Sequence, residues 1–337
     1  MATVDVTVLG AGVMGLCVAH ACLMRGARVR VIDPAGPGAG ASGGQVGALA
    51  PHVPDGWNAK KAFQFAALSM AERFWAEVAA QGGVDPGYAR LGRIQPAGDP
   101  ALARARGDAA SINWQGLATW EVIPAPTGHW RPVGADWLIR DTLSARIAPR
   151  RAVASLVAAV QALGGTLERD GQVRGAVVEA TGHAGLRALI AGTGPTDAGE
   201  KGQAALLAFD ARDRPQIFAD GVHIVPQADG TTAIGSTSER TWEDAACTDQ
   251  QLDDLINKAQ ILVPVLTGAP VVARWAGIRP RWSTRAPLLG THPTREGAFI
   301  ANGGYKIGFA IAPLAGQLLA ELILTGHNTT PPAFRPA

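Results

Sequence analysis

Residues 4–33 decide the fold, and they read VDVTVLGAGVMGLCVAHACLMRGARVRVID. An apolar run from Val6 to Leu9 enters the sequence GAGVMG at residues 10–15, and a helix-like segment then reaches Arg25. A second apolar run, Val29 to Ile32, follows. This order predicts a strand, a glycine turn, a helix and a second strand, which is the unit that binds the pyrophosphate of a dinucleotide.

Each glycine of the turn has a steric role. Gly10 permits the tight turn, Gly12 lets a pyrophosphate approach the backbone, and Gly15 lets the helix pack on the sheet. The phosphates are expected at the helix N-terminus, where unpaired N–H groups and the helix dipole favour an anion. Asp33 lies 18 residues after Gly15, near the spacing of about 20 expected of an acid that bonds a ribose hydroxyl. Because an acid there repels a 2′-phosphate, FAD or NAD fits better than NADP.

Two other interpretations of this stretch remain. One is a glycine turn that holds no nucleotide in some other α/β protein. The other is a membrane or secretory segment, because residues 6–24 carry no charge while His20 is neutral. Asp5 at its start, the lack of a basic region before it and the glycines at turn spacing all disfavour the second interpretation.

The composition indicates a globular chain of two domains. The sequence has 337 residues, of which 47% are hydrophobic and 17% charged. A formal charge of +2, with no run of Lys or Arg, argues against a nucleic-acid partner. The cysteines, Cys17, Cys22 and Cys247, form neither a disulfide framework nor a metal-binding spacing. We therefore expect no metal site, a cytoplasmic location, and buried thiols at Cys17 and Cys22.

The segment Pro34 to Ala50 is dense in glycine and uncharged, and directly follows the nucleotide strand. A flexible linker has this composition too. Its position favours a loop laid against the cofactor, with glycines where the backbone approaches closely.

The rest of the chain divides into helical and alternating segments. Apolar spacing predicts helices at residues 62–79, 100–110, 149–163 and 249–262, and a last helix from Ala312–Pro313 to Gly326. Strands are predicted at residues 88–97, 176–181 and 271–275, with irregular structure or edge strands at 114–136. Alternation and turn residues over 203–237 predict an antiparallel meander, which marks a second domain.

These segments together resemble a known family. The matching motifs are GAGVMG with Asp33, GASGGQVGALAP at 40–51, IAPRR at 147–151, EATG at 179–182, KGQ at 201–203, IVPQADGTTAIGSTSE at 224–239, WAGIRP at 275–280 and NGGYKIGFAIAPLAG at 302–316. In this ordered combination the sequence resembles the FAD-dependent D-amino-acid oxidase superfamily, nearest to glycine oxidases and D-amino-acid dehydrogenases.

The resemblance implies an α/β fold in which a Rossmann-type FAD-binding domain is interleaved with an α+β substrate domain on a mixed, largely antiparallel sheet. The FAD-binding domain is expected at residues 1–50, 140–198 and 275–330, and the substrate domain at 51–139 and 199–274. The resemblance also implies oxidation of a C–N bond by hydride transfer to the flavin N5, with the protein supplying orientation and electrostatics. No Ser–His–Asp or Cys–His arrangement is needed for that chemistry.

The turn and the matched motifs together predict the cofactor-binding residues. They are Gly10, Gly12, Gly15, Asp33, Ala41, Ser42, Gly47, Gly182, Gly303, Gly304 and Gly308. The last three precede the final helix, whose N-terminus is expected to face the flavin pyrimidine ring; a packing turn is the alternative. Relatives that bind flavin covalently use a cysteine near the C-terminal glycine motif or a histidine in the glycine stretch after the nucleotide acid. The corresponding region of this chain has Gly43–Gly44 and no nearby Cys, so non-covalent FAD is expected.

Several positions depart from the family pattern. Lys306 stands where glycine oxidases hold an arginine for the substrate carboxylate, and His223 stands where they hold a tyrosine. Gln227 replaces an expected arginine, and Thr284 an expected acid. Lys306 and His223 are the predicted catalytic-site residues. The alternatives are a solvated or cofactor-facing lysine, and a strand histidine paired with a backbone carbonyl.

The resemblance implies a small amine or D-amino acid as substrate, and oxygen, a quinone or a partner protein as electron acceptor. No membrane span is expected. Two alternatives remain: a 2-hydroxyacid dehydrogenase of the same superfamily, and a flavin-binding subunit without turnover. The altered pocket positions and the short segment between Thr166 and Gly182 keep the last one open.

Overall fold

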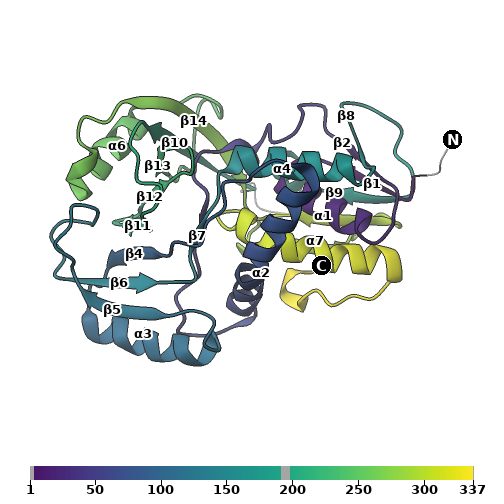
Figure 1. Ribbon diagram of the computed structural model, residues 1–337. Coiled ribbons are helices and arrows are strands. Elements are labelled where there is room, and N and C mark those ends of the chain that lie inside the picture. The colour runs from purple at the N-terminus through teal and green to yellow at the C-terminus, as the bar shows by residue number, and fades with distance from the viewer. Residues whose placement is uncertain (1–3, 191–197, 337) are drawn as a thin grey trace.

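A computed structural model of the chain, which describes residues 4–190 and 198–336, contains two large sheets that lie side by side (Figure 1). One sheet has six strands and the other has eight. The chain begins in the six-stranded sheet, crosses to the eight-stranded one, and passes back and forth until it ends beside the first. Neither sheet is therefore built from one continuous piece of chain.

The six-stranded sheet contains the nucleotide unit predicted from residues 4–33. Its order is β15 (Leu288–Thr291), β16 (Ala298–Asn302), β9 (Ala176–Glu179), β1 (Val6–Leu9), β2 (Val29–Ile32) and β8 (Thr166–Glu168). All neighbours are parallel except β15 and β16. Because β2 and β9 flank β1 on opposite sides, the chain reverses direction of winding there, and parallel sheets open a ligand crevice at such a point.

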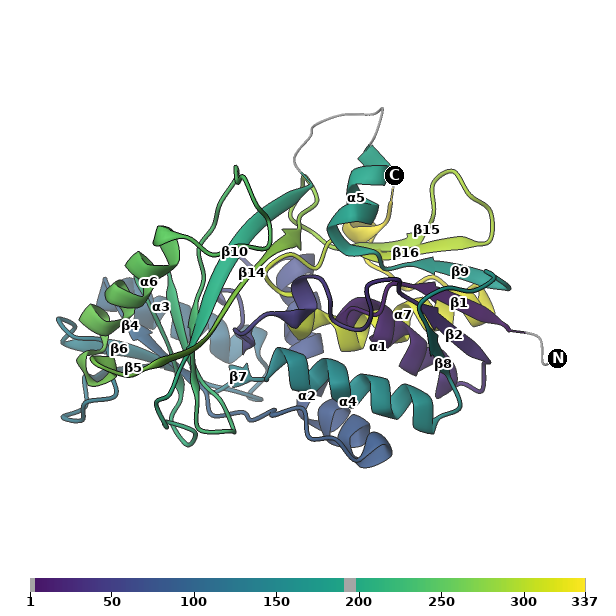
Figure 2. The same cartoon turned by 90° about the horizontal axis from the view of Figure 1, so that it is seen from above.

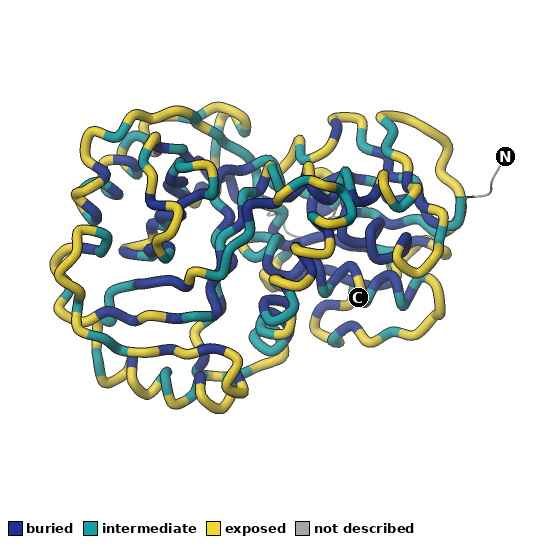
Figure 3. The backbone as a smooth tube through the Cα atoms, in the orientation of Figure 1, coloured by how far each residue is buried: buried dark blue, intermediate teal, exposed yellow. Residues whose placement is uncertain are grey.

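Helices cover this sheet and bury its core. They are α1 (Val13–Leu23), α2 (Ala59–Gly82), α4 (Pro149–Ala162), α5 (Gly182–Ile190) and α7 (Gly308–Thr325). Every residue of α1 is buried, as expected for Cys17 and Cys22. The helix packs on α7 at Gly316, where an added Cβ would lie 2.5 Å from the carbonyl oxygen of Cys17. Figure 3 shows buried segments gathered in this half of the molecule, with exposed segments along the outer loops.

The eight-stranded sheet is largely antiparallel. Its order is β14 (Val271–Pro280), β10 (Gly199–Leu207), β13 (Thr232–Gly235), β12 (Val222–Pro226), β11 (Gln216–Ala219), β4 (Arg93–Pro96), β6 (Trp137–Asp141) and β5 (Trp120–Pro124). Only β11 and β4 run parallel. Helix α6 (Gln250–Leu262) packs on β10, β12 and β13, and α3 (Pro100–Asn113) on β5 (Figure 2).

Short elements complete the chain. They are β3 (Ala48–Leu49), which pairs with β7 (Ala145–Arg146), and three single-turn helices, η1 (Ala41–Gly43), η2 (Pro264–Leu266) and η3 (Pro332–Phe334). Helix starts have local causes, because the side chains of Asn58, Asp99 and Asp249 accept hydrogen bonds from backbone N–H groups of the first turns of α2, α3 and α6.

The structure confirms the mixed α/β fold. Of the meander predicted over 203–237, it confirms β11, β12 and β13, which follow one another in the sheet; β10 instead lies between β13 and β14 and is not next to β11. Three predicted limits are wrong. The last helix begins at Gly308, and Pro313 lies inside it. Pro313 removes one hydrogen bond of the helix ladder, to the carbonyl of Phe309, but the buried residues that precede it pack as helix against α1.

The strand predicted at 88–97 shortens to β4, because Gly92 has a φ of +78° and approaches the Asp141 carbonyl. In contrast, β14 extends five residues beyond the predicted end, to Pro280, since β10 pairs with it throughout. The residue limits of the two domains stay a prediction, and residues 1–3 and 191–197 of those ranges lie outside the described residues.

Helix α7 is long and apolar enough to cross a membrane by length and composition alone. It lies against α1, α2 and β16, with half of its 18 residues buried. A core helix has these properties as well.

Candidate functional site

The turn between β1 and α1 has a conformation that requires glycine. Gly10 has a φ of +106°, and a Cβ there would lie 2.4 Å from the carbonyl oxygen of Ala180 on the neighbouring strand. A Cβ on Gly15 would lie 2.0 Å from the Gly10 carbonyl oxygen. The turn is therefore closed against β9 on one side and against α1 on the other.

The N-terminus of α1 is open to a small anionic group. Gly12 is its N-cap residue and offers no side chain to the helix. Ser42, from η1, accepts a hydrogen bond of 3.0 Å from the backbone N–H of Val13. A Cβ on Gly12 would lie 3.2 Å from the Ser42 hydroxyl, so glycine keeps this space clear. The glycine-dense segment thus folds over the helix end, where the positive end of the helix dipole attracts an anion.

Asp33 lies at the end of β2, next to the same turn. One of its carboxylate oxygens accepts a hydrogen bond of 2.8 Å from the N–H of Ala11, and the other one of 3.0 Å from the N–H of Ala35. Its side chain borders the cavity described next. The acid therefore fixes the turn and presents a carboxylate edge beside it.

A cavity of about 1270 Å³ runs from this turn to the eight-stranded sheet. The predicted site residues on its wall are Gly10, Gly12, Asp33, Ala41, Ser42, Gly47, Gly182, Gly304, Gly308, His223 and Lys306. Gly15 and Gly303 lie behind the wall. The structure thus brings residues from the beginning, the middle and the end of the chain to one cavity.

The predicted site glycines after Gly15 are required for different reasons, some by close packing and some by a positive φ. Gly47 lies so close to β7 that a Cβ would meet the Ile147 carbonyl oxygen at 2.0 Å, so packing alone demands it. Gly182 and Gly303 have φ values of +60° and +72°, which favour glycine. A Cβ on Gly304 would lie 2.9 Å from Cα of Gly308. These last glycines make the tight approach to the N-terminus of α7.

His223 lies at the far end of the cavity, on β12. Its ring is 4.6 Å from that of Phe218, and its Nδ1 is buried with no hydrogen-bond partner among the described residues. Burial, reinforced by the positive charges of Arg93, Lys306 and Arg279, lowers the pKa of His223 to about 3. The imidazole is therefore neutral at physiological pH, with one nitrogen available to a ligand.

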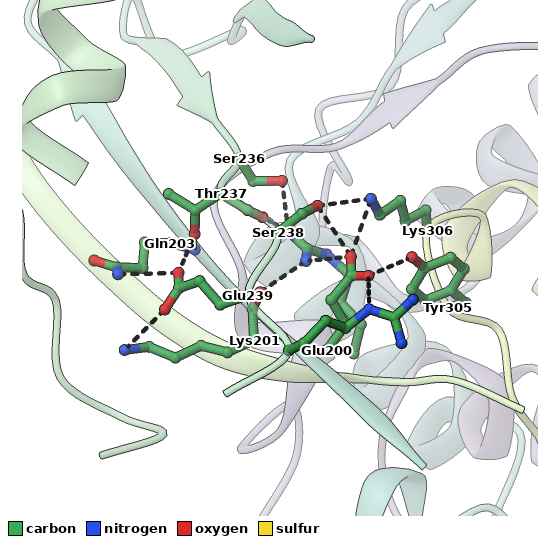
Figure 4. Close-up of polar contacts among 11 residues, drawn as sticks. Glu200, Lys201, Gln203, Ser236, Thr237, Ser238, Glu239, Tyr305 and Lys306 are labelled. Atoms are coloured by element: carbon green, nitrogen blue, oxygen red, sulfur yellow. Dashed lines mark hydrogen bonds and ion pairs between the residues drawn. The ribbon is translucent and has the colours of Figure 1, made fainter. Parts of the chain in front are cut away.

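Lys306 lines the cavity, but its ammonium group is engaged. It donates to the Ser238 hydroxyl at 2.7 Å and lies 3.0 Å from the carboxylate of Glu200 (Figure 4). Glu200 is 4% exposed and also accepts a hydrogen bond of 2.7 Å from Tyr305. Tyr305 has a φ of +44°, in the left-handed region, and adjoins Lys306 in the loop before α7. The lysine that was predicted to hold a substrate carboxylate is held by a carboxylate of the protein.

Arg279, on β14, is a second cation of the cavity wall. One terminal nitrogen lies 3.5 Å from Glu200 and donates to the carbonyl of Lys201; the other donates to Ser236 and to the carbonyl of Thr237. Both terminal nitrogens of the guanidinium group are therefore bonded within the protein.

A separate buried network lies beside this cluster, around Lys201 on β10. Its ammonium lies 3.4 Å from Glu239 (Figure 4). It also lies 3.6 Å from Asp249. Gln203 donates to both carboxylates, at 3.0 and 2.8 Å. Lys201 and Glu239 are 3% and 6% exposed, so they form a buried ion pair that joins β10 to the segment after β13.

Gln227 and Thr284, two positions at which the sequence departs from the family pattern, lie outside the cluster of Glu200, Lys306 and Arg279. Gln227 is buried and donates at 3.4 Å to the carbonyl of Gln45, a residue of the cavity wall. The Thr284 hydroxyl accepts a hydrogen bond from the N–H of Ala286. Among the described residues, no group of three or more His, Cys, Asp or Glu side chains is placed to hold a metal ion.

Sequence reasoning missed Glu200, Ser238, Arg279 and Tyr305. Each stands within or next to a matched motif: Glu200 directly precedes KGQ, Arg279 lies in WAGIRP, and Tyr305 precedes Lys306. Nothing in the spacing of residues 200 and 306 indicates that they touch, because the contact depends on how β10 meets the loop before α7.

The comparisons with known proteins agree with this geometry. Residues 5–322 match the family model of the FAD dependent oxidoreductases, DAO. The chain belongs to this family. FAD is the cofactor of the family, and the residues present fit it, since the helix end at Gly12 lines the cavity and a Cβ there would enter the space beside Ser42. Asp33 lies beside that helix end, where a ribose would follow the pyrophosphate.

This member of the FAD dependent oxidoreductase family is similar in sequence to a glycine oxidase of Geobacillus kaustophilus, at 39% identity over 108 residues, or 32% of this chain and 29% of that protein. It is also similar to a glycine oxidase of Pseudomonas putida, at 36% identity over 117 residues, or 35% of this chain and 32% of that protein. A bifunctional protein ThiO/ThiG of Nostoc is 27% identical over 359 residues, 96% of this chain and 53% of that protein. In these sequence matches the chain thus spans about a third of the length of the glycine oxidases and about half of the bifunctional protein.

Solved structures extend the likeness of the fold. The glycine oxidase from Geobacillus kaustophilus superimposes with a TM-score of 0.84 at 24% identity, covering 100% of this chain and 99% of that one. An iminodiacetate oxidase from Chelativorans superimposes with a TM-score of 0.83 at 21% identity, covering 98% of this chain and 99% of that one. At these identities the superpositions establish the fold alone. That FAD is bound without a covalent bond stays a prediction.

Proposed function

We propose that the protein oxidises the C–N bond of a small amine or D-amino acid with FAD as cofactor, as its glycine oxidase relatives are named for doing with glycine. One observation supports this most strongly. A single cavity joins the nucleotide turn at Gly10 to a pocket of the eight-stranded sheet, so a cofactor held at one end reaches a small molecule held at the other. When bound, FAD supplies the acceptor for the hydride that leaves the carbon next to nitrogen.

The chain supplies binding and solvent exclusion at the substrate end. Phe218, Trp275 and Ile278 give this end an apolar wall, and an apolar wall favours the uncharged amine by desolvation. An uncharged amine is the form that can give up a hydride, because its lone pair stabilises the resulting imine. His223, neutral and with a buried nitrogen unpartnered among the described residues, is placed to hydrogen-bond the substrate.

The test is a visible spectrum of the purified protein followed by anaerobic substrate screening. Glycine, sarcosine, D-amino acids and simple amines are mixed with the oxidised protein, and at least one should bleach the flavin band. Release of ammonia or an alkylamine identifies C–N oxidation. Bleaching only by 2-hydroxyacids, without amine release, would instead establish the hydroxyacid dehydrogenase.

Two further outcomes decide the remaining alternatives. A protein that binds FAD and is bleached by no compound of either class would be a flavin-binding subunit without turnover. For a protein that is bleached, reoxidation by air, by a quinone or only by a partner protein identifies the electron acceptor. His223→Phe is the matched variant: it should weaken reduction by substrate while leaving the spectrum of the oxidised flavin unchanged.

A further inference from the structure

The carboxylate of Glu200 pairs with Lys306, the residue to which a substrate carboxylate was expected to bind. Glu200 lies on β10, is buried, and contacts Lys306 and Tyr305, which line the substrate end of the cavity (Figure 4). The same carboxylate oxygen that faces Lys306 also accepts a hydrogen bond of 3.0 Å from Ser238. Its position is fixed by several donors at once, so Glu200 is a built part of the layer directly behind the cavity wall, where it contacts wall residues.

The cations of the cavity wall are already satisfied by this arrangement. Among the described residues, the Lys and Arg side chains on that wall are Arg279 and Lys306. Both terminal nitrogens of Arg279 are bonded to protein oxygens, and two of the three N–H groups of Lys306 are accounted for by Glu200 and Ser238. Arg240, which is not part of the wall, lies 3.5 Å from the other oxygen of Glu200 and adds to the field that holds the anion.

We propose that Glu200 is an internal counter-ion to Lys306 and Arg279, and that the substrate is accordingly an amine with an uncharged group where an amino acid carries its carboxylate. This inference rests on the proposed function. Amino amides, amino alcohols and simple alkylamines belong to the class, and free amino acids do not.

Electrostatics supports this assignment. A substrate carboxylate bound to Lys306 would stand next to Glu200, and two carboxylates that share one ammonium repel each other in a partly desolvated site. Protonation of Glu200 would relieve the repulsion. Burial raises the pKa of Glu200, but hydrogen bonds from Tyr305, Lys306 and Ser238 outweigh it and lower the pKa below its ordinary value. The side chain is therefore ionised at neutral pH, and the repulsion persists.

The test compares isosteric acids and amides. Glycine is paired with glycinamide and D-alanine with D-alaninamide, and kcat/KM for flavin reduction is measured with each. For the wild-type protein we expect the amide to be favoured over the acid by at least about tenfold. Glu200→Gln keeps the shape and removes the charge, so it should move the acid-to-amide ratio toward the acid by at least about tenfold. Glu239→Gln, which removes a buried carboxylate that pairs with Lys201 instead of Lys306, is the matched control and should leave the ratio unchanged.

A binding measurement separates this inference from the proposed function. Acetate and acetamide are titrated calorimetrically into wild-type protein and Glu200→Gln with FAD bound, which requires no turnover. Weak acetate binding by the wild type that strengthens in Glu200→Gln supports the counter-ion, even if no amine is ever oxidised. Tight acetate binding by the wild type, or an acid-to-amide ratio that Glu200→Gln does not move, would overturn it.

Lys306→Met provides a second variant should Glu200→Gln fold poorly. If Lys306 anchors a substrate carboxylate, this variant loses acetate affinity and the inference is wrong. If Glu200 is the counter-ion, acetate binding is weak before and after the change, and acetamide binding changes by less than about threefold.

Discussion

The carboxylate of Asp33 accepts a hydrogen bond of 2.8 Å from the backbone N–H of Ala11. The acid that ends β2 thereby holds the glycine turn that follows β1, in addition to facing the cavity beside it. Residues 22 positions apart are joined at the point where a pyrophosphate and a ribose would meet.

We predict that Asp33→Ala raises the dissociation constant of FAD by about ten- to a hundredfold, because a hydrogen bond to a charged group contributes about 1.5–3 kcal/mol. The measurement is a titration of the apoprotein with FAD, in which quenching of the flavin fluorescence reports binding. Asp5→Asn is the control, since Asp5 is an exposed carboxylate at the other end of β1 that pairs with Arg28. Equal effects of the two variants would show that Asp33 has no particular role in the cofactor site.

Gly12 and Gly15 should fail in different ways when changed to alanine. The backbone of Gly12 is extended, and its Cβ would enter the space beside Ser42. We expect Gly12→Ala to keep the thermal stability of the apoprotein within a few degrees and to lose most FAD affinity. A Cβ on Gly15 would lie 2.0 Å from the Gly10 carbonyl oxygen, so Gly15→Ala should lower the free energy of unfolding of the apoprotein by about 1–3 kcal/mol or more. Unfolding in denaturant, with and without FAD, separates the two effects.

His223 makes stability depend on pH. Because its folded-state pKa of about 3 lies below the ordinary value of 6.5, the unfolded chain binds more protons between these pH values, and stability falls as the pH drops through that window. His223→Gln should remove this dependence, which amounts to about 2–3 kcal/mol between pH 6.5 and 4.5. Free energies of unfolding at the two pH values test it. His129→Gln, at an exposed histidine, should leave the difference as it is in the wild type.

The buried pair of Lys201 and Glu239 should matter for stability and not for the cofactor. Lys201→Met leaves Glu239 buried without its cation, which costs about 3–5 kcal/mol. The double variant Lys201→Met/Glu239→Gln should recover part of that loss. Lys258→Met, which breaks an exposed pair with Asp220, should cost no more than about 1 kcal/mol. If Lys201→Met lost more free energy of FAD binding than free energy of unfolding, this assignment would be contradicted.

The fold of the predicted nucleotide turn could be inferred from the sequence because it is local. The turn at Gly10, the helix end at Gly12 and the acid at Asp33 lie within one strand–helix–strand unit, and the spacing of such a unit fixes its geometry. The hairpins of β11, β12 and β13 were predictable for the same reason, but the place of β10 beside β13 and β14 was not, because those pairings join strands that are not consecutive. The start of α7 was not, because packing on α1 overrides the preference of Pro313 for a helix start.

The substrate half was predicted only in part because its contacts are long-range. Lys306 and His223 were found by resemblance, and both line the cavity. Their partners were not found: Glu200 reaches Lys306 across 106 positions of sequence, and Arg279 reaches Ser236 from a strand that is not adjacent in the chain. Such pairs depend on the register between β10 and β14 and on the loop before α7, which no local pattern encodes.

The order in which the chain enters the six-stranded sheet has a consequence for biosynthesis. β1 and β2 emerge from the ribosome long before β16 and the loop that carries Lys306. A nascent chain stopped before residue 298 therefore lacks one wall of the cavity and the neighbour of β9. A complete cavity for the flavin therefore forms only after these residues have been made, and the edge of β9 that pairs with β16 stays open and needs protection until then.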